Sequence, residues 1–132
     1  MLTFKKELFK RITEHAIREF PNEACGILAG NQGRAEKVYE MSNADKSPET
    51  FFMDAGEQLK VMKEIRNKGE EMAGIYHSHV ASEAYPSRRD VELALYPDAS
   101  YVIISIKDKE NPSIRSFKIA EGKIAQEELR IE

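Results

Sequence analysis

The chain has 132 residues, of which 41% are hydrophobic and 33% are charged, and its formal net charge is −3. This length and composition fit one globular domain with a real core and exclude a disordered chain. The mild acidity argues against a nucleic-acid binder, and no apolar run approaches the ~20 residues that span a bilayer. A single cysteine, Cys25, allows no internal disulfide. The charged N-terminus is unlike a secretory signal, so we expect a cytoplasmic protein.

The first half of the chain predicts two helices and three strands. Apolar residues recur at every fourth position from Leu8 to Phe20, which predicts an amphipathic helix over residues 5–20. Residues 23–30, EACGILAG, predict a short buried strand, and residues 34–44 predict a more exposed strand after the turn NQG. Residues 50–54, TFFMD, predict a short strand that leads into a helix over residues 55–68.

The second half predicts more strands and one helix start. Residues 72–79, MAGIYHSH, predict an apolar strand, and residues 80–86 predict a loop. Ser87 resembles a helix N-cap, with Asp90 three residues later as in a capping box, and the helix should run on to Ala94. Residues 100–106 predict a central strand. Two edge-like strands follow at 114–120 and 123–131, so we expect a single α/β or α+β domain over residues 1–132, with a mixed sheet flanked by helices.

Two of the three histidines of the chain, His77 and His79, close the strand predicted over residues 72–79. Residues two apart on a strand point to the same face, so these imidazoles should project side by side. A shared cation makes that arrangement favourable, and Asp90 at the start of the next helix can reach the same point. Two neutral imidazoles and one carboxylate suit Zn²⁺ with one position left for water, which is typical of a catalytic zinc site.

Hydrolysis at such a site needs a base for the water and a donor for the oxyanion. Glu23 opens an otherwise apolar strand, where partial desolvation raises the pKa of a carboxyl group towards neutrality. It is therefore the candidate general base. Ser87, close to Asp90 in the sequence, is the candidate hydrogen-bond donor to the oxyanion.

Each of these features also has a purely structural interpretation. A lone H-x-H at a strand end is more often structural or solvated than metal-binding, and an S-x-x-D pattern is usually just a helix cap. Glu23 also fits an ordinary carboxylate at a strand edge. For Ser87, capping and catalysis are compatible, because the hydroxyl can serve both through different interactions.

Residues near the motif have simpler interpretations. Cys25 is expected to be a buried, inert thiol, with contact to a thiol-bearing product as the alternative. His15 is predicted to be a surface or interface side chain. Arg88 and Arg89 are expected to be solvated charges at a helix start, with attraction of a carboxylate as the alternative. Residues 51–53 are expected to belong to the core and the sheet surface, and an exposed one could meet a partner.

Together the motif residues resemble the JAMM motif of the MPN metallopeptidase family. That motif is an upstream Glu, then H-x-H, seven residues, Ser, two residues and Asp. Here it reads Glu23, then His77-Ser78-His79, residues 80–86, Ser87, two arginines and Asp90. The surrounding segments PNEACGILAG, GIYHSH and YPS are similar to those of bacterial and archaeal members. One departure is Val80, because many relatives have Pro directly after the second His.

The resemblance implies a fold, a cofactor and a set of roles. The fold would be an MPN/JAB1-like, cytidine-deaminase-like α/β sandwich with a curved mixed sheet. His77, His79 and Asp90 would bind Zn²⁺ with a water, Glu23 would act as general base and then acid, and Ser87 would stabilise the oxyanion. No other cofactor is implied.

The resemblance also implies a class of substrate. Family members cleave amide or isopeptide bonds after the C-terminus of ubiquitin-like proteins, and this compact chain resembles the short prokaryotic group linked to sulfur carriers of the ubiquitin fold. We therefore expect a zinc hydrolase that cuts after a carrier's C-terminal Gly-Gly, which would pair with an exposed strand edge. The alternatives are a general isopeptidase or small-peptide hydrolase without a carrier, and a non-catalytic MPN scaffold. The sequence leaves homodimerisation open.

Two other hydrolytic classes fit the sequence poorly. A serine hydrolase of the α/β type would need a G-x-S-x-G elbow, which the chain lacks. A zinc-dependent nucleotide deaminase would need a P-C-x-x-C segment, and the chain has only one cysteine.

Overall fold

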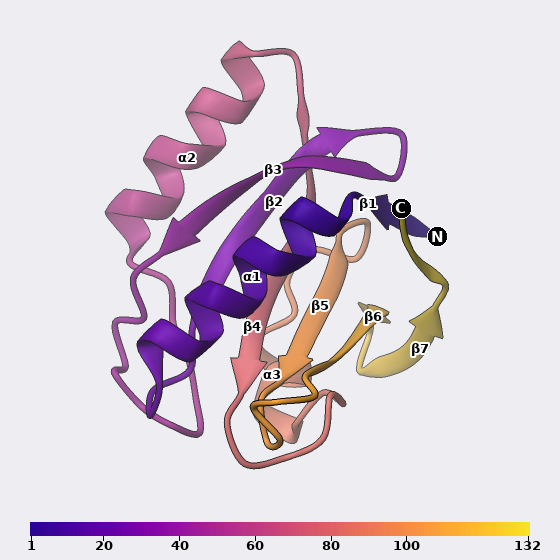
Figure 1. Ribbon diagram of the computed structural model, residues 1–132. Helices are drawn as coiled ribbons and strands as arrows, with labels where there is room; N and C mark the ends of the chain where they lie inside the picture. Colours follow the sequence, from indigo (N-terminus) through magenta and orange to yellow (C-terminus); the bar gives the residue numbers. More distant parts are fainter.

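The computed structural model describes residues 1–132 and is built around one eight-stranded mixed sheet (Figure 1). The elements in chain order are β1 (Leu2–Phe4), α1 (Lys6–Glu19), β2 (Cys25–Asn31), β3 (Arg34–Met41), α2 (Ala55–Asn67), β4 (Glu71–His79), α3 (Arg88–Glu92), β5 (Ser100–Ser105), β6 (Ser113–Ala120), β7 (Lys123–Glu127) and β8 (Leu129–Ile131). None of the helices has the length and apolarity that a membrane span requires.

The strands lie in the order β7-β6-β5-β4-β2-β3-β1-β8. β4 pairs with β5 in parallel, and the crossover between them carries the loop after β4 and helix α3. The two edge strands, β7 and β8, are separated in the chain by Glu128 alone. The sheet must therefore curve until its two edges come close to each other, which gives the curved mixed sheet expected for an MPN-type fold.

Each face of the sheet is covered by its own apolar core. Leu8, Ile12 and Ala16 of α1 pack with Tyr76 of β4 in one core, and Figure 1 shows α1 lying across that face. Ile75 of β4 packs on the opposite face with Ile65 of α2. The strand alternation of β4 thus continues to its end, and it puts His77 and His79 on the face that carries Ile75 and α2.

Most of the predicted elements are present, and the differences have physical causes. The strand predicted over residues 50–54 is wrong, because this segment makes only one isolated bridge, between Asn43 and Met53. The strand predicted over 123–131 is divided in two at Glu128, where the chain passes from one sheet edge to the other. α3 ends at Glu92 and does not reach Ala94. β1 was not predicted, since three residues show no periodicity and this strand depends on pairing with β3 and β8.

His15 corrects another prediction, because it is buried and not at the surface. It is 3% exposed, and its Nδ1 lies 2.7 Å from the hydroxyl of Tyr76. His15 is three residues after Ile12 in α1, so it falls on the same apolar stripe of the helix. The tyrosine hydroxyl satisfies the imidazole there, which allows a polar ring to remain in the core.

Candidate functional site

The end of β4 places His77 and His79 in a buried site beside α3 (Figure 1). The imidazole of His77 is stacked on the ring of Phe51, with centroids 4.5 Å apart and an interplanar angle of 24°. Phe51 comes from the segment before α2, which therefore supplies one wall of the site. The contact with Phe51 was not predicted, because no local pattern relates residues that are far apart in the chain.

Three side-chain atoms converge at this point. The Nε2 atoms of His77 and His79 are 3.1 Å apart, and Asp90 Oδ2 lies 3.0 Å from the first and 3.1 Å from the second. Ligands bound at ~2.0 Å in a tetrahedron are separated by about 3.3 Å, so this triangle is close to one face of such a tetrahedron. The donor set also fits Zn²⁺, which commonly takes His nitrogen and carboxylate oxygen. These three residues are the ones that the sequence predicted would meet.

Hydrogen bonds fix the orientation of two of these three groups. The Nδ1 of His79 lies 2.8 Å from the carbonyl oxygen of Glu83, and because a carbonyl only accepts, this nitrogen carries the proton. In the neutral ring, Nε2 then presents a lone pair to the site, as a metal ligand requires. Asp90 Oδ2 accepts a hydrogen bond from the backbone N–H of Ser87 at 2.9 Å. The Nδ1 of His77 is buried without a protein partner, so outside the triangle of converging atoms this ring is supported by stacking on Phe51.

The protonation of the three groups reflects burial and their mutual contacts. Burial lowers the pKa of His77 and favours its neutral form. Burial also acts on His79, but hydrogen bonds with Asp90 and the Glu83 carbonyl outweigh it and raise the pKa of this ring. Burial opposes ionisation of Asp90, yet its hydrogen bonds with His77 and His79 lower the pKa of the carboxyl. Asp90 is therefore a carboxylate, and a cation bound there would replace the proton that Asp90 shares with the histidines.

Glu23 lies just before β2 with its side chain 3% exposed. Burial raises the pKa of this carboxyl group to about 8, with His79 lowering it and Asp90 raising it. The carboxyl group of Glu23 is therefore close enough to His79 and Asp90 for their charges to affect its pKa. Its Oε1 is buried and has no protein hydrogen-bond partner. A buried carboxyl with a near-neutral pKa and an unpaired oxygen has the properties of a general base.

Asn43 is a supporting residue that the sequence did not reveal. Its side-chain nitrogen donates to the carbonyl oxygens of Glu23, at 3.1 Å, and Thr50, at 3.0 Å. Its Oδ1 accepts from the backbone N–H groups of Asp45, at 3.0 Å, and Phe52, at 3.1 Å. One buried amide thus joins the candidate base to the segment that carries Phe51. The asparagine lies in a predicted strand and has no local signal of this role.

Ser87 is the N-cap of α3, as predicted. Its Oγ accepts a hydrogen bond from the backbone N–H of Asp90 at 3.1 Å, and the two residues form a complete capping box. Because the hydroxyl oxygen is the acceptor in this bond, its own proton is free to be donated elsewhere. The oxyanion role predicted for Ser87 is therefore compatible with capping and stays a prediction.

Cys25 is buried, as expected for an inert thiol. Its Sγ lies 4.0 Å from the carbonyl oxygen of Met41 and 3.7 Å from that of Ser42, and burial raises its pKa to about 12. Such a thiol stays protonated and is a poor nucleophile or metal ligand. The group of side chains that could hold a metal ion contains His77, His79 and Asp90 and does not include Cys25.

An apolar hollow of about 160 Å³ adjoins the site. Phe51, which is stacked on His77, forms part of its wall, and Phe52, Leu93 and Leu95 are exposed at its rim. The hollow therefore offers apolar contacts next to the histidines.

The arginines of α3 behave as expected for solvated charges at a helix start, since Arg88 pairs with Glu92 and Arg89 lies 3.4 Å from Asp45.

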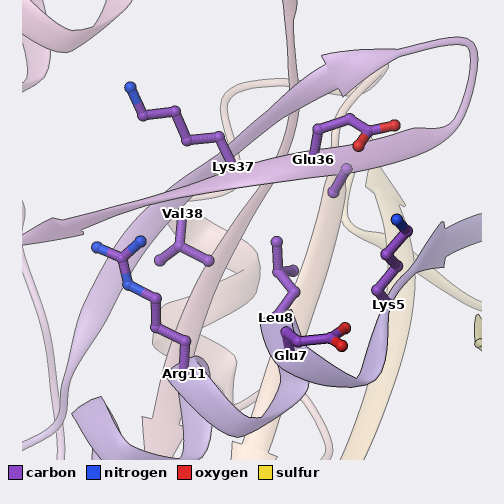
Figure 2. Close-up of a pocket in the computed structure, with 8 residues that line it drawn as sticks. Lys5, Glu7, Leu8, Arg11, Glu36, Lys37 and Val38 are labelled. Carbon is purple, nitrogen blue, oxygen red and sulfur yellow. The ribbon is translucent and has the colours of Figure 1, made fainter.

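A second groove lies elsewhere on the molecule, between α1 and β3 (Figure 2). Figure 2 shows Leu8 and Val38 at its base and charged side chains of both signs, including Lys37 and Glu36, around it. Leu8 and Val38 belong to the core on the α1 face, and the histidines of β4 point to the other face. This groove is thus separated by the sheet from the converging histidines.

The curved mixed sheet and the H-x-H…S-x-x-D arrangement define a hydrolase of the JAMM type. A family model described as prokaryotic homologs of the JAB domain matches residues 5–120, and the chain belongs to this family.

Similar proteins agree with this assignment. The chain is 43% identical to the CysO-cysteine peptidase of Mycobacterium tuberculosis, over 99% of this chain and 91% of the relative. It is 36% identical to a desampylase of Pyrococcus furiosus, over 80% of this chain and 76% of the relative. Among solved structures, a protein from Desulfitobacterium hafniense superposes with a TM-score of 0.91 at 40% identity, covering 100% of this chain and 93% of the other.

Proposed function

We propose that this chain is a zinc-dependent hydrolase that cleaves the amide or isopeptide bond after the C-terminal Gly-Gly of a small ubiquitin-like sulfur carrier. The observation that carries the proposal is the convergence of His77, His79 and Asp90 within 3.1 Å of one another, with the buried Glu23 nearby. The relatives named as a CysO-cysteine peptidase and a desampylase support a conjugated carrier as the substrate class. Residues 1–132 would act as one domain.

In this proposal His77, His79 and Asp90 hold the metal. A bound Zn²⁺ supplies Lewis acidity that makes water nucleophilic near neutral pH. Glu23 accepts the proton that the attacking water loses and then delivers it to the leaving amine. The water oxygen forms a bond to the acyl carbon and gives a tetrahedral intermediate, and the C–N bond then breaks. The second proton of the water also ends on the leaving nitrogen, so the products are a carrier with a free Gly-Gly carboxylate and a protonated amine.

Two other features of the chain suit the same reaction. The hydroxyl of Ser87 keeps its proton available while its oxygen caps α3, so it can donate to the oxyanion of the tetrahedral intermediate. His77 and His79 are both buried, and glycines, which have no side chain, suit a close approach of the substrate backbone to them. The apolar hollow beside His77 can hold an apolar side chain of the carrier upstream of the Gly-Gly.

Cleavage of a defined conjugate tests the proposal. A Gly-Gly-terminated carrier joined to cysteine or to a lysine side chain is incubated with the protein under three conditions. These are the protein alone, the protein with chelator, and the protein with chelator followed by excess zinc. We expect cleavage after Gly-Gly that chelator abolishes and zinc restores, with the intact carrier mass as one product. Equal cleavage by zinc-free protein would refute the mechanism.

The alternatives give different results in the same assay. A general isopeptidase would cleave a short Gly-Gly-lysine peptide as fast as the full conjugate. A non-catalytic scaffold would bind the conjugate and leave it intact at every zinc concentration.

A further inference from the structure

Ser78 is the middle residue of the H-x-H segment, and its side chain does not take part in the site described above. Neighbouring residues of a strand point to opposite faces, so Ser78 is directed away from the side of the sheet that carries His77 and His79. It is fully buried. A buried hydroxyl needs a hydrogen-bond partner. The partner of this hydroxyl connects the strand of the histidines to the segment of Glu23.

That partner is the backbone of Ala24, the residue directly after Glu23. The N–H of Ser78 donates to the carbonyl oxygen of Ala24 at 3.0 Å, and the N–H of Ala24 donates to the hydroxyl oxygen of Ser78 at 2.8 Å. In an ordinary antiparallel pair, two residues exchange both bonds through their backbones. Here the serine hydroxyl takes the place of the carbonyl as the acceptor. The bond lies just beyond the last ladder pair of β2 and β4, Cys25 with His77.

The other bonds of this segment lead away from β4. The N–H of Glu23 donates to the carbonyl oxygen of Ser47 at 2.8 Å, and the carbonyl oxygen of Glu23 accepts from Asn43 at 3.1 Å. Both partners belong to the chain between β3 and α2. The side chain through which the strand of the histidines holds Ala24, the residue next to Glu23, is therefore that of Ser78.

We propose that Ser78 is a positioning residue that sets Glu23 against His77 and His79. This inference deepens the proposed function and rests on it. Two histidines and a base must be held to within a fraction of an ångström to share one substrate, and a misplacement of ~1 Å can cost about 100-fold in rate. The H-x-H segment thus does two tasks, since its outer residues face the metal position and its middle residue anchors the base.

Two variants of nearly equal volume isolate the hydroxyl. Ser78→Thr keeps it and Ser78→Val removes it, while both add similar bulk to the same buried position. Ser78→Ala removes the hydroxyl without added bulk, and it replaces the Val variant if that protein does not fold. Ser116 supplies the matched control, because it is equally buried on β6 and its hydroxyl donates to Glu127 away from the histidines.

The first measurement is amide hydrogen exchange by NMR, which needs no activity. In Ser78→Val we expect exchange of the Ala24 amide to rise at least tenfold relative to that of Ile27 in the adjoining strand β2, with no such change in Ser78→Thr. Comparison of two amides in the same molecule removes the effect of global stability. An Ala24 amide that stays as protected in the Val and Ala variants as in the wild type would overturn the inference.

The second measurement is turnover at saturating zinc, with zinc affinity measured by competition with a coloured chelator. We expect Ser78→Val to lower kcat about 10- to 100-fold while zinc affinity stays within about threefold, and Ser78→Thr to restore most of the rate. Ser116→Val should leave kcat of the folded protein unchanged. In a Glu23→Gln background Ser78→Val should cost little more, because residues that act through one group are not additive.

The outcomes separate this inference from the proposed function. Equal kcat for Ser78→Val and Ser78→Thr, or a full further loss in the Glu23→Gln background, would overturn the positioning role while the function stands. A wild-type protein that cleaves no conjugate would overturn the proposed function, and the exchange comparison would still decide whether Ser78 holds the segment of Glu23.

Discussion

Replacing Glu23 with Gln tests the chemistry most directly, because the change removes the basic oxygen and almost nothing else. The side chain keeps its shape in a site where it is 3% exposed, and the triangle of His77, His79 and Asp90 is formed without it. A positioned general base contributes about 10²- to 10⁴-fold to a rate, which corresponds to about 3–5 kcal/mol of barrier. We therefore expect Glu23→Gln to bind zinc as the wild type does and to lose at least 100-fold in kcat.

The assay combines metal analysis with single-turnover cleavage of a Gly-Gly conjugate. Zinc per chain, measured by mass spectrometry of the metal, confirms that the variant is loaded, and single-turnover rates separate chemistry from product release. Glu49→Gln is the control, because this carboxyl group is exposed to solvent and acts on Glu23 only by raising its pKa. A fully zinc-loaded Glu23→Gln protein that turns over within tenfold of the wild type would refute the assignment of the base.

Three further predictions follow from the same geometry. His77→Ala should lower zinc affinity by more than 100-fold, and an unchanged zinc content would contradict the ligand assignment. In metal-free protein, Glu23 ionises above about pH 4.5 in the unfolded chain but stays protonated to about pH 8 in the folded chain, because its pKa is raised there. The free energy of unfolding of the wild type should therefore fall relative to that of Glu23→Gln across this interval, by at most about 5 kcal/mol. Denaturation midpoints of the two proteins that run parallel from about pH 4 to about pH 9 would exclude this. Leu95 is 73% exposed at the rim of the apolar hollow, and Leu95→Ala should raise KM for the full conjugate several-fold while kcat stays unchanged. Leu59 is 58% exposed on α2 and does not line the hollow, so Leu59→Ala should leave both KM and kcat unchanged. Equal KM values for the two variants would argue against the hollow as a carrier contact.

Local sequence signals predicted the parts of the site that depend on local structure. The alternation of β4 put His77 and His79 on one face, and the capping pattern placed Ser87 and Asp90 at the start of a helix, because both rules relate residues only a few positions apart. The place of Glu23 at the start of an apolar segment, together with the resemblance of the whole motif to a known family, added this residue to the group. The structure places its carboxyl group close enough to His79 and Asp90 for their charges to shift its pKa.

Contacts between distant parts of the chain were not predictable in this way. The stacking of Phe51 on His77, the hydrogen bond of Asn43 to Glu23 and the pair of His15 with Tyr76 all join segments that are adjacent only after folding. Local patterns suggested a strand for residues 50–54 and a surface position for His15. Both were wrong, because tertiary packing decides whether a short apolar run finds a pairing partner and whether a helical histidine finds a hydrogen-bond acceptor or donor in the core.

The amino-acid sequence by itself determined the order of the main elements, the residues that would meet at the end of β4 and the family to which the chain belongs. Only the tertiary structure decided how the segment of Glu23 is held, because Ala24 and Ser78 are 54 residues apart and their hydrogen bond exists only when β2 lies beside β4. The physical reason is the range of the interactions. Periodicity and capping act within a few residues, whereas burial and cross-strand hydrogen bonds require the complete sheet.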